Sequence, residues 1–168
     1  IQRALEKTQV NQYPGAELDR FKENYSRLTG LPSDQIAVAN GSDEWVKRLV
    51  RFFGGHGPIL TFYPDFIMYF KYSRQYQVDL RSIPADESFD FHIDQALDRI
   101  QKVKPKLFIF SSPNNPTGKQ FSQTEIQALA DRMIEIGGYL VIDEAYIEFG
   151  QDYKRPTGSH VLILRTMS

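Results

Sequence analysis

The sequence contains no cysteine. This absence excludes disulfide bonds, thiolate metal sites and a cysteine nucleophile together. No apolar run approaches the ~20 residues that a bilayer-spanning helix needs, and no N-terminal signal pattern is visible. Positive charge is not in excess, because 20 Lys and Arg residues stand against 21 Asp and Glu residues. Nucleic acids and anionic membranes both require concentrated positive charge, so we expect a soluble, cytoplasmic domain that binds neither.

What is present is the pattern of a layered α/β domain. The 168 residues, 41% of them hydrophobic, suit one globular domain. Short apolar runs predict strands at residues 36–39, 59–62, 78–83, 107–110, 140–142 and 161–164. Helical periodicity predicts helices at residues 16–29, 43–53, 66–74, 93–100 and 126–134. Because strands alternate with helices and several strands are continuously apolar, we predict a three-layer, doubly wound, mostly parallel sheet.

Two local features refine this prediction. Ser122 and Glu125 have the spacing of a capping box, which predicts the start of the last helix. Residues 151–160 are polar and are interrupted by Pro156 and Gly158, so they predict a surface loop.

Ligands of open α/β sheets bind beyond the carboxyl ends of the strands. After the first predicted strand, Gly41 to Glu44 open a helix, and the free N–H groups of a helix N-terminus suit a phosphate. The alternative is a simple helix cap by Ser42 or Asp43. After the second strand, Phe66 and Tyr69 could stack on a planar ligand, or could pack in the core as most aromatic residues do.

Two later segments carry stronger signals. Residues 111–118 hold two prolines and two asparagines, and such a rigid loop can aim an amide side chain at a fixed point. The alternative is an ordinary turn, but the full string is far rarer than its parts. Asp143 follows three apolar strand residues, so its carboxylate is expected to be poorly solvated and to need a partner.

A protonated ring nitrogen would serve as the partner of Asp143, and a helix cap or a salt bridge is the alternative. Asp143 and Glu144 together also suggest a metal site. However, the three histidines are scattered and have no ligand spacing. Near the end of the sequence, Thr166 and Ser168 offer hydroxyl groups that could join Ser42 around a phosphate.

Taken together, these strings resemble the fold-type I aminotransferases that use pyridoxal 5′-phosphate, most of all the histidinol-phosphate aminotransferase group. The resemblance runs from about residue 11 to residue 168. It is sharpest at five places, which occur in the family's order: residues 13–14, 41–44, 112–118, 143–146 and 165–168.

The resemblance implies a role for each matching residue. Ser42, Asp43, Thr166 and Ser168 would bind the cofactor phosphate, and Phe66 would stack on the pyridine ring. Asn115 and Tyr146 would hydrogen bond the ring's phenolic oxygen. Asp143 would pair with the protonated pyridine nitrogen, and Tyr13 would reach the cofactor of a neighbouring subunit. The implied catalytic residues are Asp143 and Tyr146.

One departure from the family bears on activity. In the family, the Schiff-base lysine directly follows the serine that matches Ser168, which is the last residue here. Lys119 is expected at the surface and does not replace it. We therefore expect residues 1–15 to form an N-terminal interface arm and residues 16–168 to form part of a cofactor-binding large domain. The chain by itself would be inactive.

The resemblance implies an enzyme that transfers an amino group from a small-molecule donor, with histidinol phosphate favoured, to the 2-oxo acid 2-oxoglutarate, and that works as a homodimer. An aromatic amino acid aminotransferase or a threonine-phosphate decarboxylase would carry the same motifs. A different alternative is a catalytically inert module that binds the cofactor or mediates dimerisation.

Overall fold

The computed structural model describes residues 15–167, so Tyr13 and Ser168 lie outside the described residues. The chain divides into two compact units, Ile1–Ala39 and Asn40–Ser168. This division falls at residue 40, whereas the predicted boundary between arm and domain falls at residue 16. The assignment of 1–15 as an interface arm stays a prediction.

The described part of the first unit is a helix followed by an extended segment. Helix α2 (Ala16–Thr29) matches the predicted bounds and ends at Gly30, which has a left-handed φ of 75°. No residue of α2 is buried, and Leu28 is 79% exposed. A 3-10 helix, η1 (Ser33–Gln35), follows.

The predicted strand at residues 36–39 is wrong. These residues have no regular secondary structure, and no strand pairing of the described residues includes them. A strand is stabilised by hydrogen bonds to a neighbouring strand, so an apolar run without such a neighbour stays irregular.

The second unit is built on a five-stranded sheet. Its strands are β1 (Ile59–Tyr63), β2 (Leu80–Pro84), β3 (Leu107–Ser111), β4 (Tyr139–Asp143) and β5 (Val161–Leu164). Their order is β2-β1-β3-β4-β5, and every neighbouring pair is parallel. Because these four parallel pairings link all five strands, the carboxyl ends of the strands lie at one edge of the sheet.

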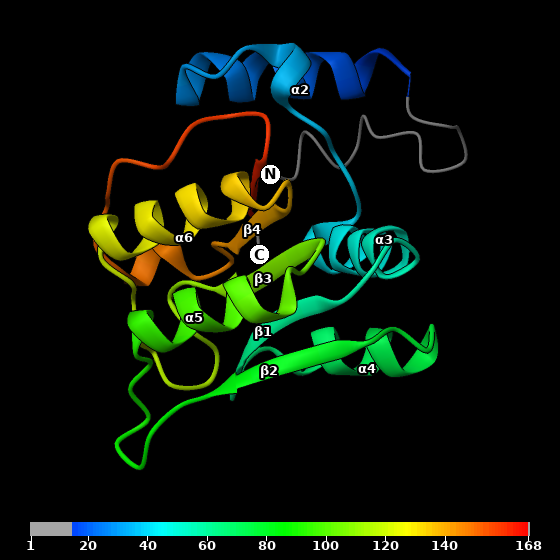
Figure 1. The fold of residues 1–168 in the computed structure, drawn as a ribbon. Helices are drawn as coiled ribbons and strands as arrows, with labels where there is room; N and C mark the ends of the chain where they lie inside the picture. Colours follow the sequence, from blue (N-terminus) through cyan, green and yellow to red (C-terminus); the bar gives the residue numbers. More distant parts are fainter. Residues whose placement is uncertain (1–14, 168) are drawn as a thin grey trace. The chain divides into compact units, whose positions relative to one another are not determined.

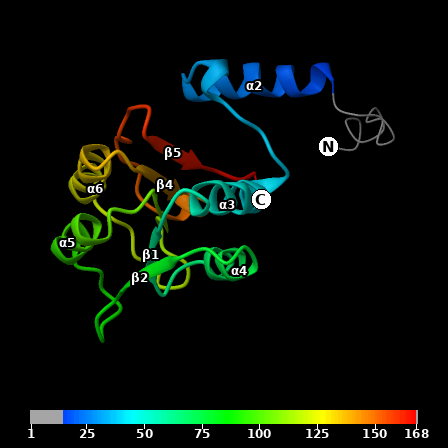
Figure 2. The ribbon, with the colours of Figure 1, turned by 45° about the vertical axis from the view of Figure 1, so that its right-hand side comes forward.

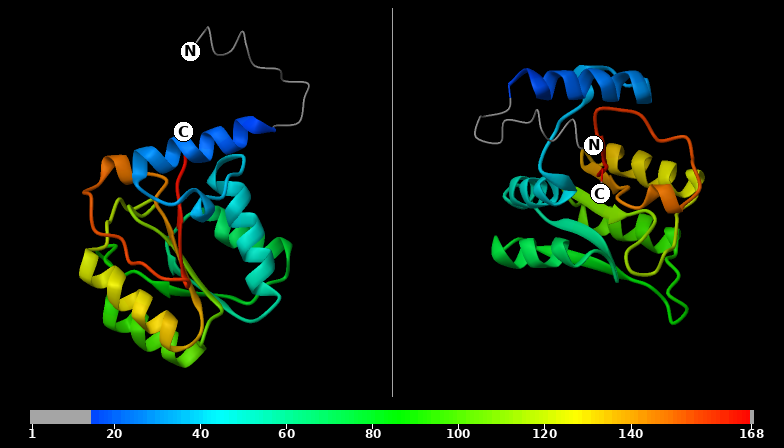
Figure 3. Two further views of the ribbon diagram at one scale, coloured as in Figure 1. Left: turned by 90° about the horizontal axis from the view of Figure 1, so that it is seen from above. Right: turned by 180° about the vertical axis from the view of Figure 1, so that it is seen from behind.

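Helices cover both faces of the sheet (Figures 1 and 2). They are α3 (Gly41–Gly54), α4 (Ile67–Gln75), α5 (Ile93–Val103) and α6 (Gln123–Glu135). Helices α3 and α4 lie side by side on one face, and α5 and α6 lie on the other, as the views of Figure 3 also show. The predicted three-layer, doubly wound α/β fold is confirmed.

Each face has its own hydrophobic core, because alternate residues of a strand point to opposite faces. On the α5/α6 face, Phe62 packs against other phenylalanines, with ring centroids 4.6 Å from Phe91 and 5.0 Å from Phe121. On the α3/α4 face, Val46 and Val50 pack with Tyr69 over Ile109. The strands are continuously apolar because both of their faces are covered.

The predicted local features are also present. The Ser122 side chain accepts a hydrogen bond from the Glu125 N–H at 3.3 Å, and the Glu125 carboxylate accepts one from the Ser122 N–H at 2.7 Å. This capping box begins α6 as predicted. Residues 151–157 form an irregular segment, which agrees with the predicted loop. Strand β2 begins at Leu80, two residues later than the apolar pattern indicates.

Candidate functional site

A cavity of about 190 Å³ lies at the carboxyl edge of the sheet. The connections from β1 and β3 leave in opposite directions here, and such a switch point is where α/β sheets bind ligands. Residues that follow four of the strands meet at this edge, and they are joined by the first turn of α3. The cavity is lined by Ser42, Phe66, Ser111, Asn115, Asp143, Ala145, Tyr146 and Thr166.

Most of the side chains predicted for the site lie in this one cavity. Six of the nine predicted residues line it: Ser42, Phe66, Asn115, Asp143, Tyr146 and Thr166. Asp43 does not, because its exposed carboxylate accepts a hydrogen bond from the Tyr72 hydroxyl at 2.6 Å. A carboxylate would also repel a phosphate, so only the Asp43 backbone N–H suits the role expected of this residue.

Asp143 is the buried acid of the cavity, at 3% exposure. It accepts hydrogen bonds from the Tyr69 hydroxyl at 3.0 Å and from the Ala145 N–H at 3.2 Å. Burial raises the pKa of Asp143 to about 6, although the hydrogen bonds from Tyr69 and Ala145 act against this rise. The described residues offer it no cation within salt-bridge distance. The carboxylate is therefore placed to receive a positive group from a ligand.

Asp65 is a second buried acid, and the sequence reasoning did not identify it. It is 6% exposed. Its carboxylate accepts hydrogen bonds from the Phe66 N–H at 2.7 Å and from the N–H and hydroxyl of Ser111. Burial raises the pKa of Asp65 to about 7, and the charge of Asp143 contributes to the rise. The signal that could have found it is its position two residues after β1 and directly before Phe66.

Residues 111–118, which we call the asparagine-containing loop, are held in place by hydrogen bonds of their own side chains. The Asn114 side-chain oxygen accepts from the N–H of Thr117 at 3.1 Å and from its hydroxyl at 2.8 Å. The Asn115 N–H donates to the Ser111 hydroxyl oxygen at 2.9 Å. The Asn115 side chain makes no hydrogen bond to another residue within 15–167, so its amide is available to a ligand.

The first turn of α3 supplies the other end of the cavity. The helix begins at Gly41 with a φ of 75°, a conformation that favours glycine. Its N-cap is Asn40, whose side chain makes no capping hydrogen bond. The predicted alternative, a cap by Ser42 or Asp43, is therefore not what the structure has. The free N–H groups of this turn remain suited to an anion.

Glu144, the neighbour of Asp143, has a different environment. Its side chain is fully buried and pairs with Arg155, whose Nε lies 2.8 Å from Oε1. The Tyr153 hydroxyl donates to the same oxygen at 2.7 Å, and the Arg165 Nε lies 3.8 Å from Oε2. No group of three or more acidic or histidine side chains within residues 15–167 could hold a metal ion. Glu144 is thus engaged by two arginines, whereas Asp143 borders the cavity, so the two adjacent acids have different partners.

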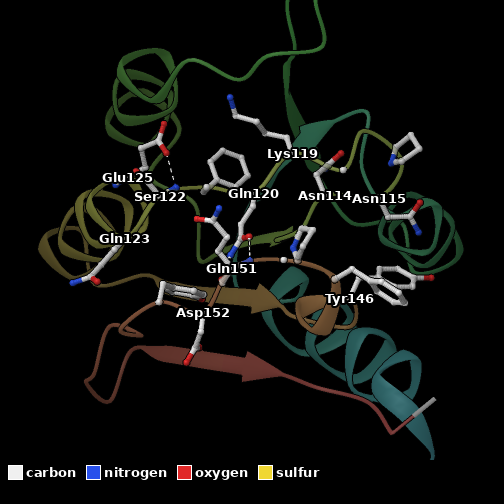
Figure 4. A pocket seen from close by; sticks show the side chains of 17 residues that line it. Asn114, Asn115, Lys119, Gln120, Ser122, Gln123, Glu125, Tyr146, Gln151 and Asp152 are labelled. Atoms are coloured by element: carbon white, nitrogen blue, oxygen red, sulfur yellow. Dashed lines mark hydrogen bonds between the residues drawn. The ribbon is translucent and has the colours of Figure 1, made fainter.

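A larger and more open cavity of about 970 Å³ adjoins the first, with Asn115 and Tyr146 lining both (Figure 4). Figure 4 shows Gln120 reaching across it to Gln151. The Gln120 amide donates to the Gln151 carbonyl and accepts from the Gln151 N–H at 2.6 Å. Gly150 allows this approach, because a Cβ atom there would collide with the Gln120 side chain. This contact joins the segment after β4 to the residues that follow the asparagine-containing loop.

Comparison with known proteins gives a consistent result. The family model described as aminotransferase class I and II matches residues 1–168. A histidinol-phosphate aminotransferase of Clostridium novyi is 34% identical over 153 residues, which are 90% of this chain and 42% of the relative. That of Pyrococcus furiosus is 36% identical over 168 residues, which are 98% of this chain and 47% of the relative.

A solved structure has the same fold. It is the histidinol-phosphate aminotransferase of Sinorhizobium meliloti in complex with pyridoxal 5′-phosphate. It has a TM-score of 0.85 at 22% identity and covers 99% of this chain and 46% of that chain. The chain thus spans less than half the length of the relatives it matches. Within residues 15–167, no helix has the length and apolar character needed to cross a membrane.

Proposed function

Because the chain belongs to the class I and class II aminotransferase family, we propose that it is the pyridoxal 5′-phosphate-binding part of an enzyme that transfers amino groups. The observation that carries the proposal is the buried Asp143 in the lining of a cavity that also holds residues predicted from the family's motifs. The relatives at 34–36% identity favour histidinol phosphate as the amino donor. The proposed acceptor is 2-oxoglutarate, and the proposed assembly is a homodimer.

The residues of the cavity fit this cofactor. A planar cationic ring needs an apolar face and a buried acceptor, and Phe66 and Asp143 offer these. A phenolic oxygen needs donors, and the Asn115 amide and the Tyr146 hydroxyl are suitable. A phosphate needs hydroxyl and N–H donors, and Ser42 and Thr166 border the cavity beside the first turn of α3.

When bound, pyridoxal phosphate acts as an electron sink that stabilises negative charge at the substrate's α-carbon. Asp143 would favour this chemistry, because its carboxylate would stabilise a proton on the ring nitrogen. Burial makes the free carboxylate costly, so its interaction with a cation is strengthened by the same low dielectric. Tyr69 and Ala145 orient the carboxylate without neutralising it, since both are uncharged donors.

The test uses the complete protein. Purified enzyme with pyridoxal phosphate should convert histidinol phosphate and 2-oxoglutarate to glutamate, followed by coupled detection of glutamate. Boiled enzyme is the control. No turnover with histidinol phosphate, but turnover with an aromatic amino acid, would replace the substrate and keep the reaction class. Release of carbon dioxide instead of glutamate would replace the reaction class, and no binding of pyridoxal phosphate would refute the proposal.

A further inference from the structure

We propose that Asp65 is a positioning residue, which fixes Phe66 and Asn115 on the cavity through two separate sets of hydrogen bonds. The inference rests on the proposed function only for the identity of the ligand. The geometry that carries it is independent of that identity, because both chains of hydrogen bonds begin at one buried carboxylate.

The first link runs to Phe66. The Phe66 N–H donates to Asp65 Oδ1 at 2.7 Å, directly before α4 begins at Ile67. Phe66 is the N-cap residue of α4, and its backbone is non-helical, with a φ of −52° and a ψ of 119°. The carboxylate therefore holds the backbone from which the aromatic side chain projects to the cavity.

The second link runs across the sheet to the asparagine-containing loop. The Ser111 N–H, at the end of β3, donates to Asp65 Oδ2 at 3.2 Å, and the Ser111 hydroxyl donates to Oδ1. With its proton engaged, the Ser111 oxygen accepts from the Asn115 N–H at 2.9 Å. The order of donors and acceptors is thus fixed from Asn115 through Ser111 to Asp65.

The carboxylate is chemically required at this position because three donors converge on it and both of its oxygens accept. An asparagine has one accepting oxygen and one donating nitrogen. With its oxygen toward Phe66, its nitrogen would face the Ser111 N–H. Asparagine can therefore keep part of the arrangement, and alanine can keep none of it.

Charge supports the same assignment. No Lys or Arg is among the described residues that line the cavity. The ionisable groups that act on Asp65 are Asp143 on β4 and Tyr69 on α4. The charge of Asp143 raises the pKa of Asp65, so a cationic ligand at Asp143 also favours the ionised, fully accepting form of Asp65.

The experiment measures binding in the complete protein with pyridoxine 5′-phosphate, which lacks the aldehyde and binds without a covalent bond. Calorimetry is performed on the wild type and on Asp65→Ala, Asn115→Ala and the double variant. We expect Asp65→Ala to weaken binding about tenfold, and to weaken it only about threefold when Asn115 is already alanine, because the link to Phe66 is then the part that is still lost. This non-additivity identifies residues that act through each other.

Two further variants keep the test decisive if Asp65→Ala does not fold. Ser111→Ala removes only the hydroxyl link, so it should weaken binding in the wild type and have little effect in the Asn115→Ala background. Asp65→Asn should bind with an affinity between those of the wild type and Asp65→Ala. Asp98→Asn, the same change on the exposed face of α5, is the control and should bind as the wild type does.

The inference is overturned if Asp65→Ala, or in its place Ser111→Ala, binds within twofold of the wild type. It is also overturned if the effects of that variant and Asn115→Ala simply add. If the wild type binds neither pyridoxine phosphate nor pyridoxal phosphate, the proposed function fails instead, so the two failures are distinguishable.

Discussion

Asp143 and Glu144 are neighbours in the sequence, and both are buried, but their surroundings are opposite. Asp143 accepts hydrogen bonds from uncharged donors and borders a cavity. Glu144 is paired with the guanidinium groups of Arg155 and Arg165. Among residues 15–167, Asp143 thus has no cation within salt-bridge distance, whereas Glu144 is compensated by two arginines. The difference separates an acid that suits a ligand from an acid that stabilises the structure.

The largest effect is expected from removing the charge of Asp143. Asp143→Asn in the complete enzyme should lower kcat/KM for transamination about 1,000-fold, or ~4 kcal/mol. The reason is that an amide does not hold a proton on a ring nitrogen. Steady-state kinetics check this, with Asp98→Asn as the control. A loss below tenfold would mean that Asp143 is not the acid that faces the ligand.

Glu144 should show its effect in stability. Glu144→Gln leaves Arg155 and Arg165 without their shared buried acceptor, so the free energy of unfolding should fall by about 3 kcal/mol. Urea denaturation measures it. Glu148→Gln is a matched control, because Glu148 also pairs with Arg165, at 2.8 Å, but is itself exposed. We expect a change of less than ~1 kcal/mol there. Equal losses in the two variants would contradict the distinction.

The pH dependence of stability should identify Asp143 directly. Its folded pKa of about 6 lies above the ordinary value of 3.8. Between these two values the folded state binds more protons than the unfolded state, so this group's contribution to stability falls as pH rises. Asp143→Asn removes that loss. Relative to the wild type without ligand, the variant should therefore gain about 2 kcal/mol between pH 4 and pH 8.

The contribution of Asp65 to stability should also fall as pH rises, and the fall should continue to a higher pH, because the pKa of Asp65 is raised to about 7. The measurement for both acids is urea denaturation of the ligand-free protein across this pH range. A stability difference between Asp143→Asn and the wild type that does not vary with pH would show that Asp143 titrates normally.

The smallest change tests the uncharged donor to Asp143. Tyr69→Phe removes one hydrogen bond and leaves the ring, so stability at pH 8 should fall by about 1 kcal/mol. The pKa of Asp143 should rise further, because the bond from Tyr69 lowers it. The pH range over which the free energy of unfolding falls because of Asp143 should therefore extend to higher pH. Tyr72→Phe, which removes an exposed bond to Asp43, is the matched control. A shift of equal size there would contradict the prediction.

Much of the site could be predicted because the strands are parallel. Residues that directly follow parallel strands must meet at one edge, so the sequence positions of Phe66, Asn115 and Asp143 already implied a common site. The predicted strand at 36–39 failed for the opposite reason. Its apolar residues satisfy the local pattern, but strand formation depends on a partner that the local pattern does not specify.

The sequence by itself determined the layers, the capping box at Ser122 and most of the residues around the cavity, since these follow from periodicity and from order along the chain. Only the tertiary structure decided the partners of the buried acids. Ser111 lies 46 residues from Asp65, and Asp143 lies 74 residues from Tyr69. Contacts over such separations depend on strand order and register. Because burial removes water as the alternative partner, those contacts decide which acid is compensated and which is left for a ligand.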